Sequence, residues 1–461
     1  MRAPAGWVIE KAAIATVDGA GTEHASGHLV VSGGRIAAVG AGPAPTSAVP
    51  EGARRVDGSG CLVTPGFVNT HHHFYQWLTR GLAPDADLFS WLTALYPMWA
   101  LIDAEMEHAA TLGSLVALVS SGCTTTMDHH YIFPAGGGDL LAAEVEAARE
   151  VGVRFHPARG SMDLGRSAGG LPPDEVVEAT DAALAATEEA IGRYHDPSPG
   201  SMVRVAVAPC SPFSVTPELL SGAAGIARRA GVRLHTHLAE TVEEEDYCRE
   251  RFGCSPTEYV ESLGWLGDDV WLAHGVHLGA AARARVAATG TGVAHCPSSN
   301  GRLGAGIAPV PELLAAGAPV GLGVDGTASN ESGQLGPELR AALLAGRARS
   351  GPTALGTRDV LEMATMGGAR CLGRADEIGS LEVGKLADVA LWRLDTAAHA
   401  GMADPVAALT LGSLPPLGLL LVGGRALVED GELLTVDVDR VAREAGAAAA
   451  RLAARASAPA H

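Results

Sequence analysis

Three consecutive histidines, His71, His72 and His73, follow an apolar segment in "PGFVNTHHHFYQWLTRG" at residues 65–81. Side chains of an extended segment alternate between two faces, so His71 and His73 point the same way and His72 points the opposite way. Two imidazoles on one face can approach a single metal ion. The pair alone is weak evidence, because a lone histidine is more often a structural residue. Other potential ligands in the chain decide between these interpretations.

Further potential ligands stand at the ends of other apolar segments, far apart in the chain. They are His237 in "HTHLAE", His274 in "LAHGVHL" and Asp325 in "GVDGTASN". Three imidazoles and one carboxylate suit a borderline divalent ion and leave a coordination position for water. Such an ion lowers the pKa of its water from about 16 towards roughly 7. We therefore predict a hydrolytic site with one divalent ion, Zn²⁺ as the first choice and Fe²⁺ as the alternative.

Glu240 lies three residues after His237, just past the predicted end of its strand. A carboxylate at this position can exchange a proton with the activated water without binding the ion itself. The alternative interpretation is an ordinary acidic residue at the start of a helix. Glu240 is therefore the candidate general acid and base.

The lysine content argues for one ion rather than two. The chain has only two lysines, Lys11 and Lys385, and neither falls in its central region. Barrel hydrolases that hold two ions often bridge them with a carbamylated lysine or a glutamate at the fourth strand. The corresponding segment here, "VAVAPCSPF", contains neither residue type. A lysine Schiff base is excluded on the same grounds.

The elements that must position these residues form a repeated strand-and-helix pattern. Eight short apolar segments, separated by helix-like segments, end in polar or ligand-type residues. They are "GFVNTHH", "CTTTMDHH", "VRFHPARG", "VRVAVAPC", "VRLHTHLAE", "VWLAHGVH", "TGVAHCPSSN" and "PVGLGVDGT". Such a series favours an α/β fold, a (β/α)8 TIM-type barrel, in which the C-terminal ends of all strands meet on one face. The candidate ligands would then be neighbours.

Both ends of the chain have a different texture of short strands and glycine-rich turns. We predict that residues 1–64 and 375–430 pair into one small β-sandwich domain. The barrel would then occupy residues 65–374. Residues 431–461 are predicted to form an alanine-rich C-terminal helix and a tail.

Composition limits the partners and the compartment. The formal net charge of −19 argues against nucleic acid or an anionic membrane surface as a partner. Seven cysteines without paired spacings indicate reduced thiols, and we find neither a signal peptide nor an apolar run long enough to cross a bilayer. We expect a cytoplasmic protein whose partner is a small molecule.

The motifs "PGFVNTHHH", "HTHLAE", "LAHGVHL", "AHCPSSN" and "GVDGTASN", in this order, resemble the amidohydrolase superfamily. The resemblance is to its mononuclear cytosine-deaminase-like branch, which includes the triazine chlorohydrolases. More narrowly, "NTHHHFYQWLTRG", "DHHYIFP" and "APCSPFSV" are similar to the 8-oxoguanine deaminases of this branch. The resemblance implies a hydrolytic deaminase, with conversion of 8-oxoguanine to urate and ammonia as the first activity to test. Barrels of this branch commonly associate, so we expect a homo-oligomer.

The resemblance also implies a role for individual residues. The zinc ligands would be His71, His73, His237 and Asp325. Glu240 would shuttle protons and His274 would orient the water or polarise the ring, while Asp325 would also accept the first proton from the water. The resemblance also gives Gln76 a role in substrate binding. Three further candidates for substrate binding come from their position or residue type and not from the resemblance: Cys210 at the end of the fourth strand, the aromatic Trp99, and Asp163 after the third strand.

Several alternatives stay open at this point. Gln76 can be a solvated loop residue, Cys210 a packing residue, and Trp99 a core residue like most aromatics at helical spacing. The same site could serve an isoxanthopterin, other pterin or purine deaminase, or a triazine hydrolase that releases chloride or an alkylamine. A barrel that binds a ligand without catalysis is the remote alternative.

Overall fold

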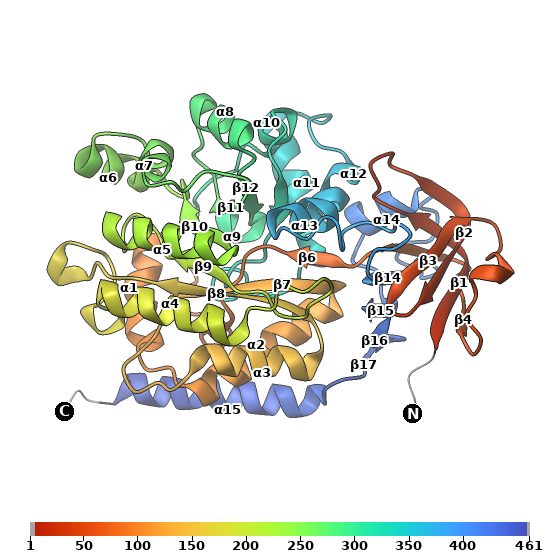
Figure 1. Ribbon diagram of the computed structural model, residues 1–461, viewed down its shortest axis with the longest axis horizontal. Helices are drawn as coiled ribbons and strands as arrows, with labels where there is room; N and C mark the ends of the chain where they lie inside the picture. The colour runs from red at the N-terminus through yellow and green to blue at the C-terminus, as the bar shows by residue number, and fades with distance from the viewer. Residues whose placement is uncertain (1–4, 459–461) are drawn as a thin grey trace.

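Eight parallel strands form a closed barrel in the computed structural model, which describes residues 5–458 (Figure 1). Around the barrel their order is β10-β11-β12-β13-β6-β7-β8-β9. Their bounds are β6 (Phe67–Asn69), β7 (Cys123–His130), β8 (Arg154–Ser161), β9 (Ala206–Pro209), β10 (Arg233–Leu238), β11 (Val270–His274), β12 (Gly292–His295) and β13 (Val320–Leu322). Each coincides with or overlaps one of the eight predicted segments, so the predicted barrel is confirmed.

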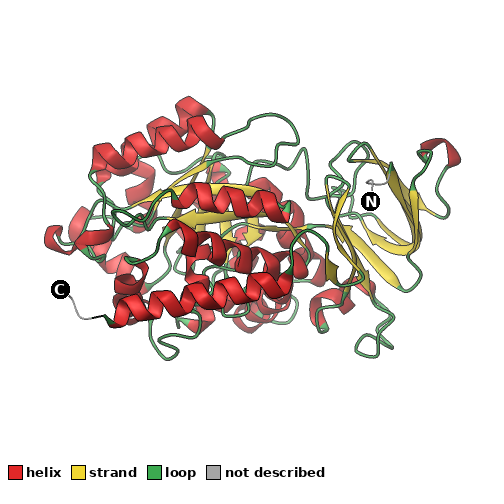
Figure 2. Cartoon of the chain, turned by 90° about the horizontal axis from the view of Figure 1, so that it is seen from below, coloured by secondary structure: helices red, strands yellow, loops and turns green. Residues whose placement is uncertain are grey.

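Helices cover the outside of the barrel (Figure 2). The α-helices are α1 (Leu88–Trp99), α2 (Ala104–Ser120), α3 (Leu140–Val151), α4 (Thr180–Tyr194), α5 (Pro217–Ala230), α6 (Val242–Phe252), α7 (Pro256–Ser262), α8 (Ala280–Thr289), α9 (Pro297–Arg302), α10 (Val310–Ala315), α11 (Gly336–Ser350), α12 (Thr357–Glu362) and α13 (Gly368–Cys371). Shorter helical turns are η1 (Thr46–Ala48), η2 (Phe74–Thr79), η3 (Arg166–Ala168), η4 (Asp174–Val176) and the π-helical η5 (Met363–Gly367).

Local sequence signals explain where these helices begin and end. In α5 the Thr216 side chain accepts a hydrogen bond from the backbone N–H of Leu219, and Pro217 occupies the first turn, where its missing N–H costs nothing. Gly231 ends the helix in the left-handed conformation at φ 68°. The helix thus returns the chain to the start of β10 at a defined position.

The two chain ends form one continuous nine-stranded mixed sheet beside the barrel (Figure 1). Its order is β17-β16-β15-β14-β5-β1-β2-β3, with β4 paired to β1. The strands are β1 (Gly6–Ala15), β2 (Glu23–Ser32), β3 (Arg35–Ala41), β4 (Arg54–Asp57), β5 (Cys61–Pro65), β14 (Val389–Arg393), β15 (Leu417–Val422), β16 (Arg425–Glu429) and β17 (Glu432–Leu433). The antiparallel pairing of β5 with β14 joins the two ends of the chain. This confirms a small β-domain built from both chain ends, and its predicted bounds stay a prediction.

A buried ion pair fastens this sheet to the bottom of the barrel. Arg154, in β8, donates from Nε to Oδ2 of Asp388 at 2.6 Å and from Nη2 to Oδ1 at 3.1 Å. Asp388 also accepts a hydrogen bond from the backbone N–H of Gly423 at 2.7 Å. The carboxylate therefore joins a barrel strand to the turn between β15 and β16.

The last helix, α15 (Val438–Ser457), lies along α2 on the outside of the barrel (Figure 1), and α14 (Pro405–Leu411) lies between β14 and β15 in the chain. Arg455 and Arg451 of α15 form ion pairs with Asp103 and Glu105 at the start of α2. Residues 459–461, the end of the predicted tail, lie outside the described residues. Within residues 5–458, no helix combines the length and the apolar character that a membrane span requires.

Candidate active site

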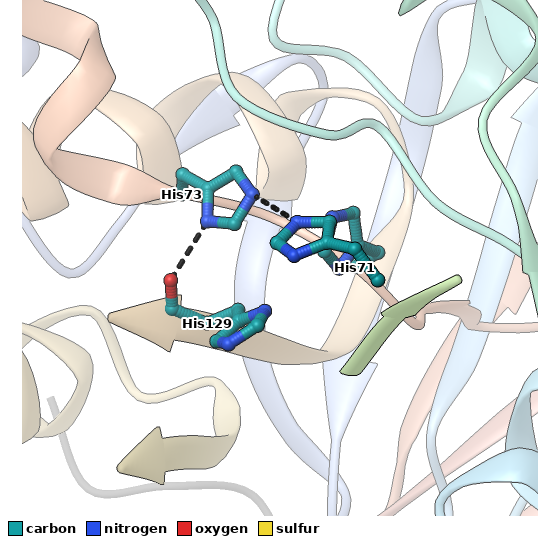
Figure 3. A group of neighbouring side chains, drawn as sticks. His71, His73 and His129 are labelled. Atoms are coloured by element: carbon teal, nitrogen blue, oxygen red, sulfur yellow. Dashed lines mark hydrogen bonds between the residues drawn. The ribbon is translucent and has the colours of Figure 1, made fainter. Parts of the chain in front are cut away.

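The predicted metal ligands from three parts of the chain meet at the C-terminal end of the barrel. Nε2 of His73 lies 3.1 Å from Nε2 of His237. Oδ1 of Asp325 lies 3.4 Å from Nε2 of His71 and 3.4 Å from Nε2 of His73. All four side chains are buried. Figure 3 shows His71, His73 and His129 close together at the end of β7.

Backbone carbonyls fix the proton positions on two of these rings. Nδ1 of His73 donates to the carbonyl oxygen of His129 at 2.7 Å (Figure 3), and Nδ1 of His237 donates to that of Cys210 at 2.7 Å. A carbonyl oxygen can only accept, so each Nδ1 carries the proton. In the neutral ring, Nε2 is then a lone pair directed into the site.

The proton position on the ring of His71 is fixed by another histidine, His235. Nδ1 of His235 donates to the carbonyl oxygen of Trp271 at 2.8 Å, so its Nε2 is an acceptor. That Nε2 lies 2.8 Å from Nδ1 of His71, which must therefore be the donor. Nε2 of His71 remains a buried lone pair without a hydrogen-bond partner in the described part of the chain. Such a hydrogen bond from behind is how proteins orient a histidine ligand.

These residues fit a divalent cation. The two lone pairs at 3.1 Å repel each other, and neither ring has a proton to place between them. Burial lowers the pKa of His73 to about 4 and that of His71 and His237 well below the usual value, so these imidazoles are neutral at pH 7. A cation that accepts all three lone pairs and the Asp325 carboxylate relieves the repulsion.

Glu240 and His274 stand beside this group. Nδ1 of His274 is 3.0 Å from Oδ1 of Asn300, and its Nε2 lies 3.6 Å from Oε2 of Glu240 and 3.9 Å from Oδ2 of Asp325. Burial raises the pKa of Glu240 to about 6. Burial alone would lower the pKa of His274, but the charges of Glu240 and Asp325 outweigh it and raise that pKa. The pair can therefore hold or release protons close to neutral pH.

The backbone that presents these residues adopts unusual conformations. Ala239, His274 and Asp325 have φ values of 54°, 72° and 66°, in the left-handed region that residues with a side chain rarely enter. The carboxylate of Glu244 accepts hydrogen bonds from the backbone N–H groups of Ala239 at 2.8 Å and of Glu240 at 3.4 Å. Each such conformation costs about 1–3 kcal/mol, and strain of this kind concentrates at functional sites.

Asp325 is held by two further donors. Oγ of Ser299 donates to Oδ2 at 2.6 Å, and the backbone N–H of Gly326 donates to Oδ1 at 2.7 Å. Gly326 also makes room for a neighbour, because a Cβ atom there would lie 1.8 Å from Oε1 of Gln76. A side chain at position 326 would therefore displace the Gln76 amide.

A cavity that is partly open to solvent adjoins these residues. Gln76 and Cys210, two of the predicted substrate-binding residues, line this cavity. Its apolar walls include Phe89, Trp91, Leu92, Tyr96, Tyr131 and Phe213.

Two predicted substrate-binding residues do not line this cavity. Trp99 is fully buried behind it, and its Nε1 donates to Oγ1 of Thr79 at 3.0 Å. The Asp163 carboxylate accepts hydrogen bonds from the hydroxyl and N–H of Thr216 and from the hydroxyl of Thr180. Trp99 therefore supports the aromatic wall from the rear, and Asp163 fixes the loop that precedes α5.

Some residues of the site were not singled out from the sequence. His129, at the end of β7, stacks on His237 with a ring centroid distance of 4.7 Å and belongs to the same group of potential ligands. Its position in "MDHH" at a strand end was the available signal. Ser299 gave no signal of its own, because its contact with Asp325 depends on the turn after β12.

A (β/α)8 barrel that gathers imidazoles and a carboxylate at one end, with a glutamate of raised pKa beside a cavity, is the architecture of a metal-dependent barrel hydrolase. The chain matches the model of the amidohydrolase family over residues 62–414. It therefore belongs to the amidohydrolase family.

Individual relatives and solved structures show which proteins of this family the chain resembles. The chain is 47% identical to the 8-oxoguanine deaminase of Pseudomonas aeruginosa, over 97% of this chain and 99% of that protein. It is 39% identical to the hydroxydechloroatrazine ethylaminohydrolase of Pseudomonas sp. strain ADP, over 94% and 92% of the two chains. The zinc-bound structure of atrazine chlorohydrolase from Arthrobacter aurescens superposes with a TM-score of 0.91 at 34% identity, over 96% of this chain and 99% of that one.

Proposed function

We propose that this protein is a zinc-dependent deaminase that acts on a C–N bond of a cyclic amidine, converting 8-oxoguanine to urate and ammonia. His71, His73, His237 and Asp325 would hold the ion. The observation that carries the proposal is the meeting of these four ligands: Oδ1 of Asp325 lies 3.4 Å from Nε2 of His71 and of His73, and Nε2 of His73 lies 3.1 Å from that of His237. The 47% identity to an 8-oxoguanine deaminase supports the choice of substrate.

When bound, a zinc ion supplies a water of lowered pKa and polarises the bond under attack. Glu240, with a pKa of about 6, is then suited to accept a proton and return it to a ring nitrogen of the substrate. His274, 3.6 Å from Glu240, would orient the attacking water and keep Glu240 in place. Asp325 would accept a proton through Oδ2, the oxygen that faces His274 at 3.9 Å.

The cavity walls support a flat, polar heterocycle as the substrate. Oε1 of Gln76 is buried and has no hydrogen-bond partner within residues 5–458, and an amide offers both a donor and an acceptor to a purine edge. Trp91 and Tyr96 provide aromatic surface for the ring, and Cys210 lies beside His237. Trp99 and Asp163 would act on the substrate only through the residues that they hold.

Ammonia release from protein of known metal content tests this proposal. We expect rapid release from 8-oxoguanine and much slower release from guanine and isoxanthopterin. A triazine hydrolase is the second candidate, favoured by the TM-score of 0.91 to an atrazine chlorohydrolase. Release of chloride or ethylamine from triazines, without ammonia from any purine or pterin, would select that function and reject ours.

The compartment and the assembly are also part of the proposal. None of the seven cysteines forms a disulfide, which supports a reducing compartment such as the cytoplasm. We propose that the enzyme works there as a homo-oligomer on a free small molecule. Light scattering of the purified protein would show the assembly.

A further inference from the structure

A second group of potential ligands lies outside the barrel, between β7, α2 and α3 (Figure 1). Asp128 and His130 of β7 point away from the barrel interior, on the face opposite to His129. Glu107 of α2 and Glu144 of α3 meet them there. All four side chains are fully buried, with exposed fractions of 0%.

The proton of the neutral His130 ring is on the nitrogen that faces away from these acids. Nε2 donates to the carbonyl oxygen of Ile132 at 2.7 Å, so Nδ1 of the neutral ring is a lone pair. Nδ1 lies 2.7 Å from Oε1 of Glu144 and 3.7 Å from Oε1 of Glu107. Neither Nδ1 of His130 nor Oε1 of Glu144 has a hydrogen-bond partner among the described residues, and an ionised Glu144 brings no proton to lie between the two atoms.

The carboxylates of this group also lack compensating partners. Both oxygens of Glu144, Oε2 of Glu107 and Oδ2 of Asp128 have no hydrogen-bond partner among the described residues. The positive charge of Arg159 acts on His130, but this guanidinium is already paired with Glu178 at 2.7 Å. Burial raises the pKa of Glu107 and of Glu144 to about 8, so without a cation these groups retain protons at neutral pH. A cation bound between them would replace those protons.

We propose that Glu107, His130 and Glu144 bind a second divalent transition-metal ion, separate from the ion of the active site. The arrangement repeats that of the active site. In both, one ring nitrogen of a histidine is held by a hydrogen bond, and the other nitrogen faces a carboxylate oxygen. The separation is 2.7 Å between His130 and Glu144, and 3.4 Å between His71 and Asp325. One imidazole and two carboxylates suit ions such as Zn²⁺ or Mn²⁺. The ion would fasten α2 and α3 to β7, and this role does not depend on the proposed substrate.

The metal content of the unmodified protein is the first test. After incubation with zinc and removal of excess metal, we expect inductively coupled plasma mass spectrometry to find two zinc ions per chain. The active-site ion adjoins an open cavity, whereas the second site is enclosed, so a chelator should remove one ion quickly and the other slowly. A single ion per chain, lost in one phase together with activity, would overturn the proposal and favour carboxyl groups that share protons.

A matched pair of variants assigns the slowly lost ion. Glu144→Gln should bind one zinc ion per chain instead of two, with a lower Tm and with turnover per active-site ion unchanged. Glu146→Gln, at an exposed position two residues along the same helix, should keep two ions and the original Tm. A count of two in Glu144→Gln would contradict the site. If that variant does not fold, an anomalous-scattering map of the unmodified protein still decides, because it must show a peak between Glu107, His130 and Glu144.

Discussion

Nε2 of His73 and Nε2 of His237 lie 3.1 Å apart, and each ring has already committed its Nδ1–H to a backbone carbonyl. Two buried lone pairs at this separation repel each other, and a cation bound between them relieves that repulsion. The positions of both rings are set by the barrel, since His237 lies in β10 and His73 follows β6. The chemistry of the site therefore depends on the barrel closing in the observed order.

His235 should control metal affinity without touching the ion. His235→Phe removes the acceptor for Nδ1–H of His71 and frees that ring to rotate. We expect zinc affinity to fall by about 10–100-fold, as for other residues that orient a histidine ligand. Competition with a chromophoric chelator measures this, with the partly exposed His108→Gln as a control. An unchanged affinity would show that His71 does not need His235.

Glu240 should carry protons and leave the metal content unchanged. Glu240→Gln keeps the shape of the side chain but cannot accept a proton, so we expect turnover to fall by about 10²-fold or more. Glu243→Gln, on the exposed side of the same segment, should retain turnover. Near-normal turnover in Glu240→Gln, with metal content verified, would remove the proposed role.

Glu338 should make the protein less stable as the pH rises. Burial raises the pKa of Glu338 from 4.5 to about 7, so the folded state retains a proton that the unfolded state has lost. The proton's contribution to stability is complete below pH 4.5 and disappears as the pH rises to about 7, a difference of up to about 3 kcal/mol.

The Glu338→Gln variant isolates this effect, because glutamine keeps an oxygen for Ser298 and Asn330 but does not titrate. Between pH 5 and pH 8, the Tm of the variant should rise relative to that of the unmodified protein. Parallel Tm curves for the two proteins would show that Glu338 has an ordinary pKa.

The Arg154–Asp388 pair should be a major link between the barrel and the β-domain. Asp388→Ala leaves the buried guanidinium of Arg154 without its carboxylate, and we expect a loss of about 3–5 kcal/mol in the free energy of unfolding. The exposed pair of Arg451 with Glu105 provides the control, because Glu105→Ala should cost at most about 1 kcal/mol. Equal effects of the two substitutions in denaturant unfolding would contradict this view.

The features of the site that the sequence predicts are those set by the geometry of parallel strands. His71, His237 and Asp325 stand at or just past strand ends, and a barrel brings all such ends together whatever the loops do. Residues of the cavity wall are harder to predict. Trp91 and Trp99 both belong to α1, and only the packing of that helix decides that Trp91 faces the cavity and Trp99 the core.

The roles of polar residues outside the strand ends are equally hard to predict from the sequence. Asp163 resembles a substrate contact, yet its carboxylate holds the threonines around the start of α5. Glu107 and Glu144 resemble ordinary helical acids, and their meeting with His130 depends on how α2 and α3 pack on β7. Tertiary packing, and not local pattern, determines each of these roles.

An anomalous-scattering map measured above and below the zinc absorption edge tests the central claim most directly. We expect a peak about 2.0–2.2 Å from Nε2 of His71, His73 and His237 and from an oxygen of Asp325. If active crystals hold no metal at this point, or hold it on other ligands, these four residues do not bind the catalytic ion and the proposed mechanism is contradicted.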